Sequence, residues 1–258
     1  AVHFCAARWK LRPICMLEMK LVLASTSPRR NELLRLLGIP FEKRPSNADE
    51  THPEDEDTLE YVLQMAREKG QIVRHSEGEW ILSADTIVAL DGRVVGKPAD
   101  DGEAYQILRA LRARGHLVHT ALCLRTKNGD APIESLCTTD VFMRDYTEQE
   151  LAEYVASKDY KDKAGGYAIQ HKQFHPCTGV KGCYANVMGL PLCHLAMLLQ
   201  SAGCKLDADV PHACQRYNDI TYEDYPQIYR RENPGEDDEI LQQDPICVPH
   251  CSDVALWL

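Results

Sequence analysis

The hydrophobic and polar positions of the chain predict strands and helices in alternation. An apolar run at residues 20–24 predicts a strand, and the helix after it has clear start and stop signals. Ser27 can cap the helix N-terminus, Pro28 suits the first helical position, and Gly38 is typical of a helix end. A second helix is expected after the acidic loop at residues 47–58, because apolar residues then recur at helical spacing.

The middle of the chain has a pattern typical of a sheet. Residues 80–98 predict a strand that continues into a hairpin, with Asp91 and Gly92 as its two-residue turn. Further strands are expected at residues 116–126 and 134–144, joined through a turn that contains Asn and Gly.

Helix signals alternate with these strands. Asp100 or Asp101 is expected to cap a third helix, and Thr147 with Glu150 forms the capping-box pattern of a fourth. The remaining expected elements are short strands at residues 165–170 and 182–187 and a core helix at residues 190–203. This order predicts a mixed α/β sheet with helices on its faces.

Composition places the chain among ordinary globular proteins. The 258 residues are 44% hydrophobic and 26% charged, and no apolar run approaches the ~20 residues that cross a bilayer. We expect residues 1–19 to be an N-terminal extension, 20–203 the main domain and 204–258 an acidic C-terminal extension. The eleven cysteines include no CxxC pair, so we expect reduced thiols in a cytoplasmic protein.

The acidic charge is concentrated at the C-terminal end. The chain carries a net charge of −10, and residues 205–258 hold twelve Asp and Glu against four Lys and Arg. Neither part has the basic surface typical of a nucleic-acid binder. A site for phosphate groups would therefore need its positive charge gathered locally.

Two short stretches place charge where a strand or a helix does not require it. Arg29 and Arg30 fall in the first turn of a predicted helix, where a cation opposes the helix dipole. An anionic ligand explains this placement, and two solvated surface arginines are the alternative. Asp85 lies within an apolar strand, so it is either a paired structural acid or a functional one.

Other polar residues are individually weak signals. Lys97 follows a strand and could reach a phosphate, although its surroundings do not match a nucleotide P-loop. Lys163 precedes two glycines that permit close backbone approach, and the amide of Gln170 could pair with a base edge. His116 and His119 alternate with apolar residues on a predicted strand, and we expect them to be structural.

Read in order, several blocks resemble the Maf family of nucleoside triphosphate pyrophosphatases. They are "LASTSPRRNELL", "SADTIV", "GKP", "HLVHT", "DKAGGYAIQ" and "GCYANVMGLPL", within residues 20–203. The resemblance implies an elongated α/β fold with two lobes around a deep nucleotide cleft, and it is compatible with a homodimer. It also implies hydrolysis of a nucleoside triphosphate to a monophosphate and pyrophosphate with a divalent metal cation, Mg or Mn. Neither a nucleic acid nor a membrane is expected as a partner.

The resemblance further implies roles for ten residues. Asp85 matches the family's proton acceptor, and Glu50 with Asp85 would hold the metal. The positions tied to base choice are Arg29, Thr86 and Gln170. The positions that match the polar and charged lining of the phosphate site are Ser27, Arg30, Lys69, Lys97 and Lys163. Thr86 and Gln170 favour dTTP and UTP as substrates. The alternatives are the 7-methyl-GTP subgroup and a nucleotide-binding regulator of cell division.

Overall fold

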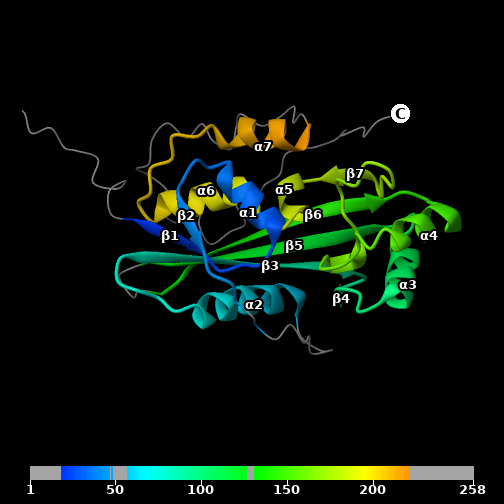
Figure 1. Cartoon of the computed structure of the whole chain (residues 1–258), viewed down its shortest axis with the longest axis horizontal. Helices are drawn as coiled ribbons and strands as arrows, with labels where there is room; N and C mark the ends of the chain where they lie inside the picture. The colour runs from blue at the N-terminus through cyan, green and yellow to red at the C-terminus, as the bar shows by residue number, and fades with distance from the viewer. Residues whose placement is uncertain (1–18, 47, 49–56, 127–130, 221–258) are drawn as a thin grey trace, which may run out of the picture.

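The computed structural model describes residues 19–46, 48, 57–126 and 131–220 (Figure 1). Glu50, the expected turn before the strand at 134–144, and most of both predicted extensions lie outside the described residues.

A mixed sheet of seven strands forms the centre of the described structure. Its strands are β1 (Lys20–Leu23), β2 (Phe41–Lys43), β3 (Glu79–Leu90), β4 (Arg93–Val95), β5 (Gly115–Arg125), β6 (Ile133–Met143) and β7 (Cys177–Lys181). The spatial order is β2-β1-β3-β5-β6-β7, with β4 paired to β3. Strand β1 is parallel to β2 and β3, and the other pairs are antiparallel. The long strands β3, β5 and β6 make the described structure elongated (Figure 1).

Helices cover both faces of this sheet. They are α1 (Pro28–Arg35), α2 (Thr58–Ile72), α3 (Asp101–Leu111), α4 (Glu148–Ala156), α5 (Tyr184–Val187), α6 (Leu192–Ser201), α7 (Val210–Asn218) and the 3₁₀ turn η1 (Ala164–Gly166). Helix α2 packs on β3 and β5 on one face, and α1, α5, α6 and α7 lie on the other (Figure 1). The predicted mixed α/β architecture with flanking helices is therefore confirmed. No described helix is long and apolar enough to cross a membrane.

Several local predictions are also confirmed. The Oγ of Ser27 accepts a hydrogen bond from the backbone N–H of Arg30 at 3.4 Å, and Asp100 caps α3. Thr147 forms the predicted capping box of α4 with Glu150. Each signal is local in sequence, so the surrounding fold does not override it.

Two predictions of secondary structure are wrong, and one helix is not predicted at all. Residues 165–170 do not form a strand, because Gly165 and Gly166 take φ values of 68° and 67°, which no strand accommodates. Residues 182–187 contain the short helix α5, and the neighbouring strand is β7, which precedes them. The sequence pattern also does not predict α7, whose two buried apolar positions, Val210 and Cys214, are too few to reveal its period.

Candidate active site

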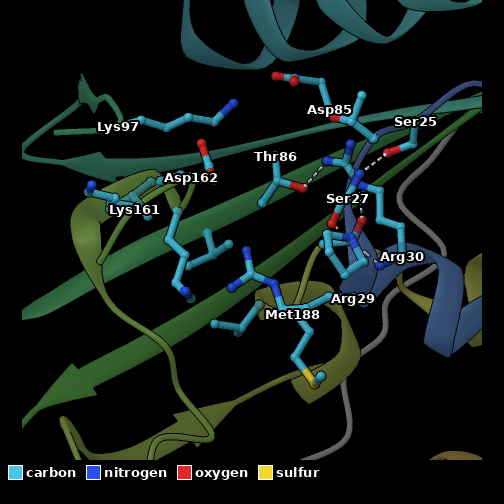
Figure 2. Close-up of a pocket in the computed structure, with 18 of the residues that line it drawn as sticks. Ser25, Ser27, Arg29, Arg30, Asp85, Thr86, Lys97, Lys161, Asp162 and Met188 are labelled. Atoms are coloured by element: carbon cyan, nitrogen blue, oxygen red, sulfur yellow. Dashed lines mark hydrogen bonds between the residues drawn. The ribbon is translucent and has the colours of Figure 1, made fainter. Parts of the chain in front are cut away.

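One cavity of about 710 Å³ gathers most of the residues singled out from the sequence (Figure 2). It lies where the segment after β1, the N-terminus of α1, the middle of β3 and the turn before η1 meet. The predicted site residues that line it are Ser27, Arg29, Arg30, Lys69, Asp85, Thr86, Lys97, Lys163 and Gln170. The tenth, Glu50, lies outside the described residues.

Helix α1 points its N-terminus and two arginines at this cavity. The guanidinium of Arg29 is largely withdrawn from water, and this burial lowers its pKa. The nearby charges of Asp159 and Asp162 partly oppose that shift. Its Nε atom is buried and finds no acceptor among the described residues. An unpaired N–H donor beside a helix N-terminus suits an anionic or hydrogen-bond-accepting ligand.

A directional chain of hydrogen bonds fixes Arg30. Its Nε donates to the carbonyl of Gly189 at 2.8 Å and its Nη2 donates to Thr86 Oγ1 at 2.9 Å (Figure 2). Thr86 Oγ1 lies 2.9 Å from Thr120 Oγ1, which donates to the carbonyl of Asn186 at 3.0 Å. Because a hydroxyl has a single proton, Thr120 must accept from Thr86. The Thr86 proton is therefore committed, and Thr86 can offer a ligand only an acceptor.

Gly189 is required by the close approach of this chain. Its φ is +101°, and a Cβ there would lie 3.2 Å from Thr86 Oγ1 and 3.4 Å from Arg30 Nε. Any larger residue would combine backbone strain with crowding of the Arg30 guanidinium. The glycine therefore lets the turn after α5 support α1 from across the cavity.

Asp85 forms a buried ion pair with Lys69. The Nζ of Lys69 on α2 lies 2.5 Å from Asp85 Oδ1 on β3, and both residues are only 6% exposed. Asp85 is thus a paired acid and also a lining residue of the cavity. Of the two interpretations left open by the sequence, the structure confirms the paired acid: Lys69 compensates the buried carboxylate, which also lines the cavity. A functional role for Asp85 stays a prediction.

The opposite wall mixes cations with carboxylates that the sequence reading missed. Lys163 Nζ donates to the backbone carbonyl of Asp159 and to its Oδ1, the latter at 3.0 Å. Asp159, Lys161 and Asp162 line the cavity beside it, as does Glu32 of α1. The only signal in the sequence for Asp159, Lys161 and Asp162 is that they lie within four residues of Lys163. Acids next to cations read as a solvated turn when the sequence is considered alone.

Apolar and aromatic side chains also line the cavity. They are Val88, Val118, Tyr167, Val187 and Met188, and the lining residue Gln170 is exposed. The hydroxyl of Tyr167 is 2.7 Å from His116 Nε2, and burial lowers the pKa of His116 to about 4. His116 therefore contacts Tyr167, a lining residue, and His119 forms a hydrogen bond with Thr138. Both contacts fit the expected structural role.

The donor set bears on the expected metal. The described residues contain no group of three or more His, Cys, Asp or Glu side chains that could hold an ion. Magnesium, however, is commonly held by one or two carboxylates together with substrate phosphates and water. Asp85 supplies one such carboxylate in the cavity, which fits a metal that arrives with a phosphate-bearing ligand.

These features define an α/β protein whose cavity suits a polyanionic, phosphate-bearing ligand, because six lysine and arginine side chains face four carboxylates in an otherwise acidic chain. Residues 20–202 match the family model described as Maf-like protein. The chain belongs to this family.

Curated relatives align with most of the chain. A dTTP/UTP pyrophosphatase from Syntrophus aciditrophicus (strain SB) is 40% identical over 73% of this chain and 92% of the relative. Those of Anaeromyxobacter sp. (strain Fw109-5) and Thermomicrobium roseum are 43% and 41% identical over 76% and 77% of this chain, and 95% and 93% of their own lengths. A solved HAM1 protein from Coxiella burnetii aligns with 50% of this chain and 74% of its own at 21% identity and a TM-score of 0.33, too low to support an argument.

Proposed function

We propose that the protein hydrolyses dTTP and UTP, and modified pyrimidine triphosphates, to the monophosphate and pyrophosphate. The observation that carries this proposal is the Asp85 carboxylate beside Lys69 in a cavity rich in cations. Relatives about 40% identical and named dTTP/UTP pyrophosphatases support the same activity.

The triphosphate would bind among the cations that line the cavity. The N-terminus of α1 offers the backbone N–H of Arg29 and the positive end of the helix dipole, since Pro28 has no N–H and the Arg30 N–H donates to Ser27 Oγ. Arg30, Lys97 and Lys163 add positive charge around the phosphates. Because Arg30 is already held by Gly189 and Thr86, it needs little reordering when the substrate binds.

Asp85 would orient the attacking water and take its proton. A triphosphate repels a nucleophile, so the water must be held in line with the departing pyrophosphate while nearby cations offset charge. Lys69 fixes the position of the Asp85 carboxylate and compensates its charge between turnovers. The reaction breaks the bond between the α-phosphorus and the bridging oxygen, and pyrophosphate leaves with that oxygen.

Family membership supports a divalent metal cation, and we propose Mg²⁺ or Mn²⁺. Asp85 and Glu50 would hold it together with phosphate oxygens. When bound, the metal would neutralise phosphate charge and polarise the phosphoryl oxygens.

Base choice would involve Arg29, Thr86 and Gln170. Uracil and thymine present an acceptor, a donor and an acceptor along one edge. Thr86 can only accept, the Arg29 Nε–H can only donate, and the Gln170 amide can do both. Together they offer groups complementary to such an edge.

A panel of triphosphates with Mg²⁺ and with Mn²⁺ tests this function. We expect pyrophosphate, and no inorganic phosphate, to be released fastest from dTTP or UTP. Faster release from 7-methyl-GTP would assign the protein to that alternative. Tight triphosphate binding without any turnover would instead support a regulatory role, such as the control of cell division.

The assembly and location remain predictions. A homodimer would be detected by light scattering of the purified full chain. A fluorescent fusion would test the cytoplasmic location.

A further inference from the structure

Helix α7 lies beyond the part of the chain that matches the family, yet it belongs to the folded core. The family match ends at residue 202, and α7 spans Val210–Asn218. Val210 and Cys214 are 1% and 3% exposed in the main hydrophobic cluster. The helix packs against α6 and α5, on the same side of the sheet as α1 (Figure 1). This placement brings α7, which lies outside the family-matched residues, near α1, the helix that carries Arg29 and Arg30.

A hydrogen bond joins α7 to α1. The Tyr217 hydroxyl donates to Glu32 Oε2 at 2.7 Å, across 185 residues of sequence. Tyr217 is 41% exposed, yet partial desolvation and the bond to Glu32 raise its pKa to about 12, so the phenol keeps its proton over the usual range of pH. Glu32 lines the cavity, whereas Tyr217 is not among the lining residues. The bond therefore ties the carboxylate of a cavity-lining residue to α7.

Glu32 carries a charge that a triphosphate would encounter. Its carboxylate is close enough to Arg29 to help raise the pKa of that arginine against the effect of burial. A carboxylate free to swing over the cavity would repel phosphates and compete with them for the cations. A hydrogen bond that holds the carboxylate at the rim reduces this repulsion and this competition.

We propose that Tyr217 is a positioning residue that holds Glu32 at the rim of the cavity, so that helix α7 tunes the affinity of the site for its triphosphate. The inference rests on the proposed function for its ligand, and it adds a contribution from outside the family-matched residues. Tyr217 is not among the residues that line the cavity. Its effect should therefore appear in KM and in binding, with kcat unchanged.

The test compares Tyr217→Phe, which keeps the ring and removes the hydroxyl, with the wild-type full chain. We expect KM for dTTP or UTP to rise about three- to tenfold with kcat unchanged, which corresponds to the net contribution of one ordinary hydrogen bond. In a Glu32→Gln background the same substitution should have no further effect, because the released side chain is neutral. Tyr105→Phe, on α3 and outside the cavity lining, is the matched control and should match the wild type.

Calorimetric binding of an α,β-methylene analogue of dTTP separates this inference from the proposed function. If wild type neither binds the analogue nor hydrolyses dTTP or UTP, the proposed function fails. If wild type binds it and Tyr217→Phe binds it equally well, the positioning role is wrong. A lower melting temperature with unchanged KM and binding would also overturn the inference, by reducing the hydrogen bond to a purely structural contact.

Discussion

Arg30 Nη2 donates a hydrogen bond to Thr86 Oγ1 at 2.9 Å, joining the first turn of α1 to the centre of β3. The resemblance to the family assigns the arginine to the phosphate lining and the threonine to base choice. The bond makes them one unit, because the orientation of the guanidinium depends on the hydroxyl. A change at either residue should therefore affect phosphate binding.

Thr86→Val tests this coupling. The substitution keeps the shape of the side chain and removes one of the two acceptors that hold Arg30, so its guanidinium should be less firmly oriented. We expect KM to rise about tenfold for every triphosphate tested, as for loss of one charge-assisted hydrogen bond. Thr86→Ser keeps the hydroxyl and should stay close to wild type. A change in base preference alone, with KM for the best substrate unchanged, would show that Thr86 acts only on the base.

Gly189→Ala should impair both folding and binding. At a φ of +101° the new Cβ would be strained and would crowd Thr86 and Arg30. We expect the free energy of unfolding in urea to fall by roughly 1–3 kcal/mol and KM to rise. Gly203→Ala is the control, because Gly203 has a φ of +91° with open space around it. It should lose stability and keep KM, whereas equal KM values in both variants would argue against the crowding.

The sequence predicts those parts of the structure that depend on local chemistry. The Ser27 cap and the Asp91 turn depend on residues a few positions apart, and the structure contains both. The strand predicted at residues 182–187 fails because α5 is stabilised by burial against distant strands, which no local pattern reports. Tyr217 and Glu32 are 185 residues apart, so their contact depends on the whole fold.

The candidate site shows the same division. Charges in unfavourable places, such as Arg30 in a first helical turn and Asp85 in an apolar strand, pointed to the cavity. The carboxylates of Asp159 and Glu32 gave no such signal, since acids on turns and helices are ordinary on a surface. Thr120 was missed because a threonine in a strand is typical, and only its contact with Thr86 gives it a part in the site.

Asp85→Asn should abolish turnover. The amide cannot accept the proton of the attacking water, and we expect kcat to fall by at least about 100-fold. Asp91→Asn is a matched control on the same hairpin, because Asp91 has a positive φ that Asn tolerates and its carboxylate pairs with Arg114 outside the cavity. Pyrophosphate release, measured well below the melting temperature, compares the two. Wild-type rates in Asp85→Asn would mean that another group activates the water.

Lys69→Met should destabilise the fold as well as the site. It leaves the Asp85 carboxylate buried without its cation, and we expect unfolding in urea to become easier by about 3 kcal/mol. Adding Asp85→Asn to this variant removes the uncompensated charge and should recover part of the loss. A double-mutant cycle over the four proteins measures the coupling. Additive effects would show that the pair contributes no coupling energy.

Buried histidines with lowered pKa values should make stability depend on pH, and His116 and His194 have the largest shifts. Burial lowers the pKa values of His116 and His194 from 6.5 to about 4. Below pH 6.5 these histidines therefore bind protons in the unfolded chain and stay neutral in the folded chain. The free energy of unfolding falls as pH drops from 6.5 to 4. Above pH 6.5 both states are neutral at these positions and the contribution is constant. Each histidine accounts for up to roughly 3 kcal/mol of the decline.

His194→Leu on α6 isolates one of these contributions. The His194 Nδ1 finds no hydrogen-bond partner within the described structure, so the substitution removes the titration without breaking a bond at that atom. Urea unfolding at several pH values should show a shallower decline between pH 6.5 and 4, whereas the exposed His212→Asn should keep the wild-type slope. The carboxylates of Glu79 and Glu150, whose pKa values Arg44 and Arg144 hold low, lose their contribution at more acidic pH in every variant. An unchanged slope in His194→Leu would mean that this histidine does not stay neutral in the folded protein.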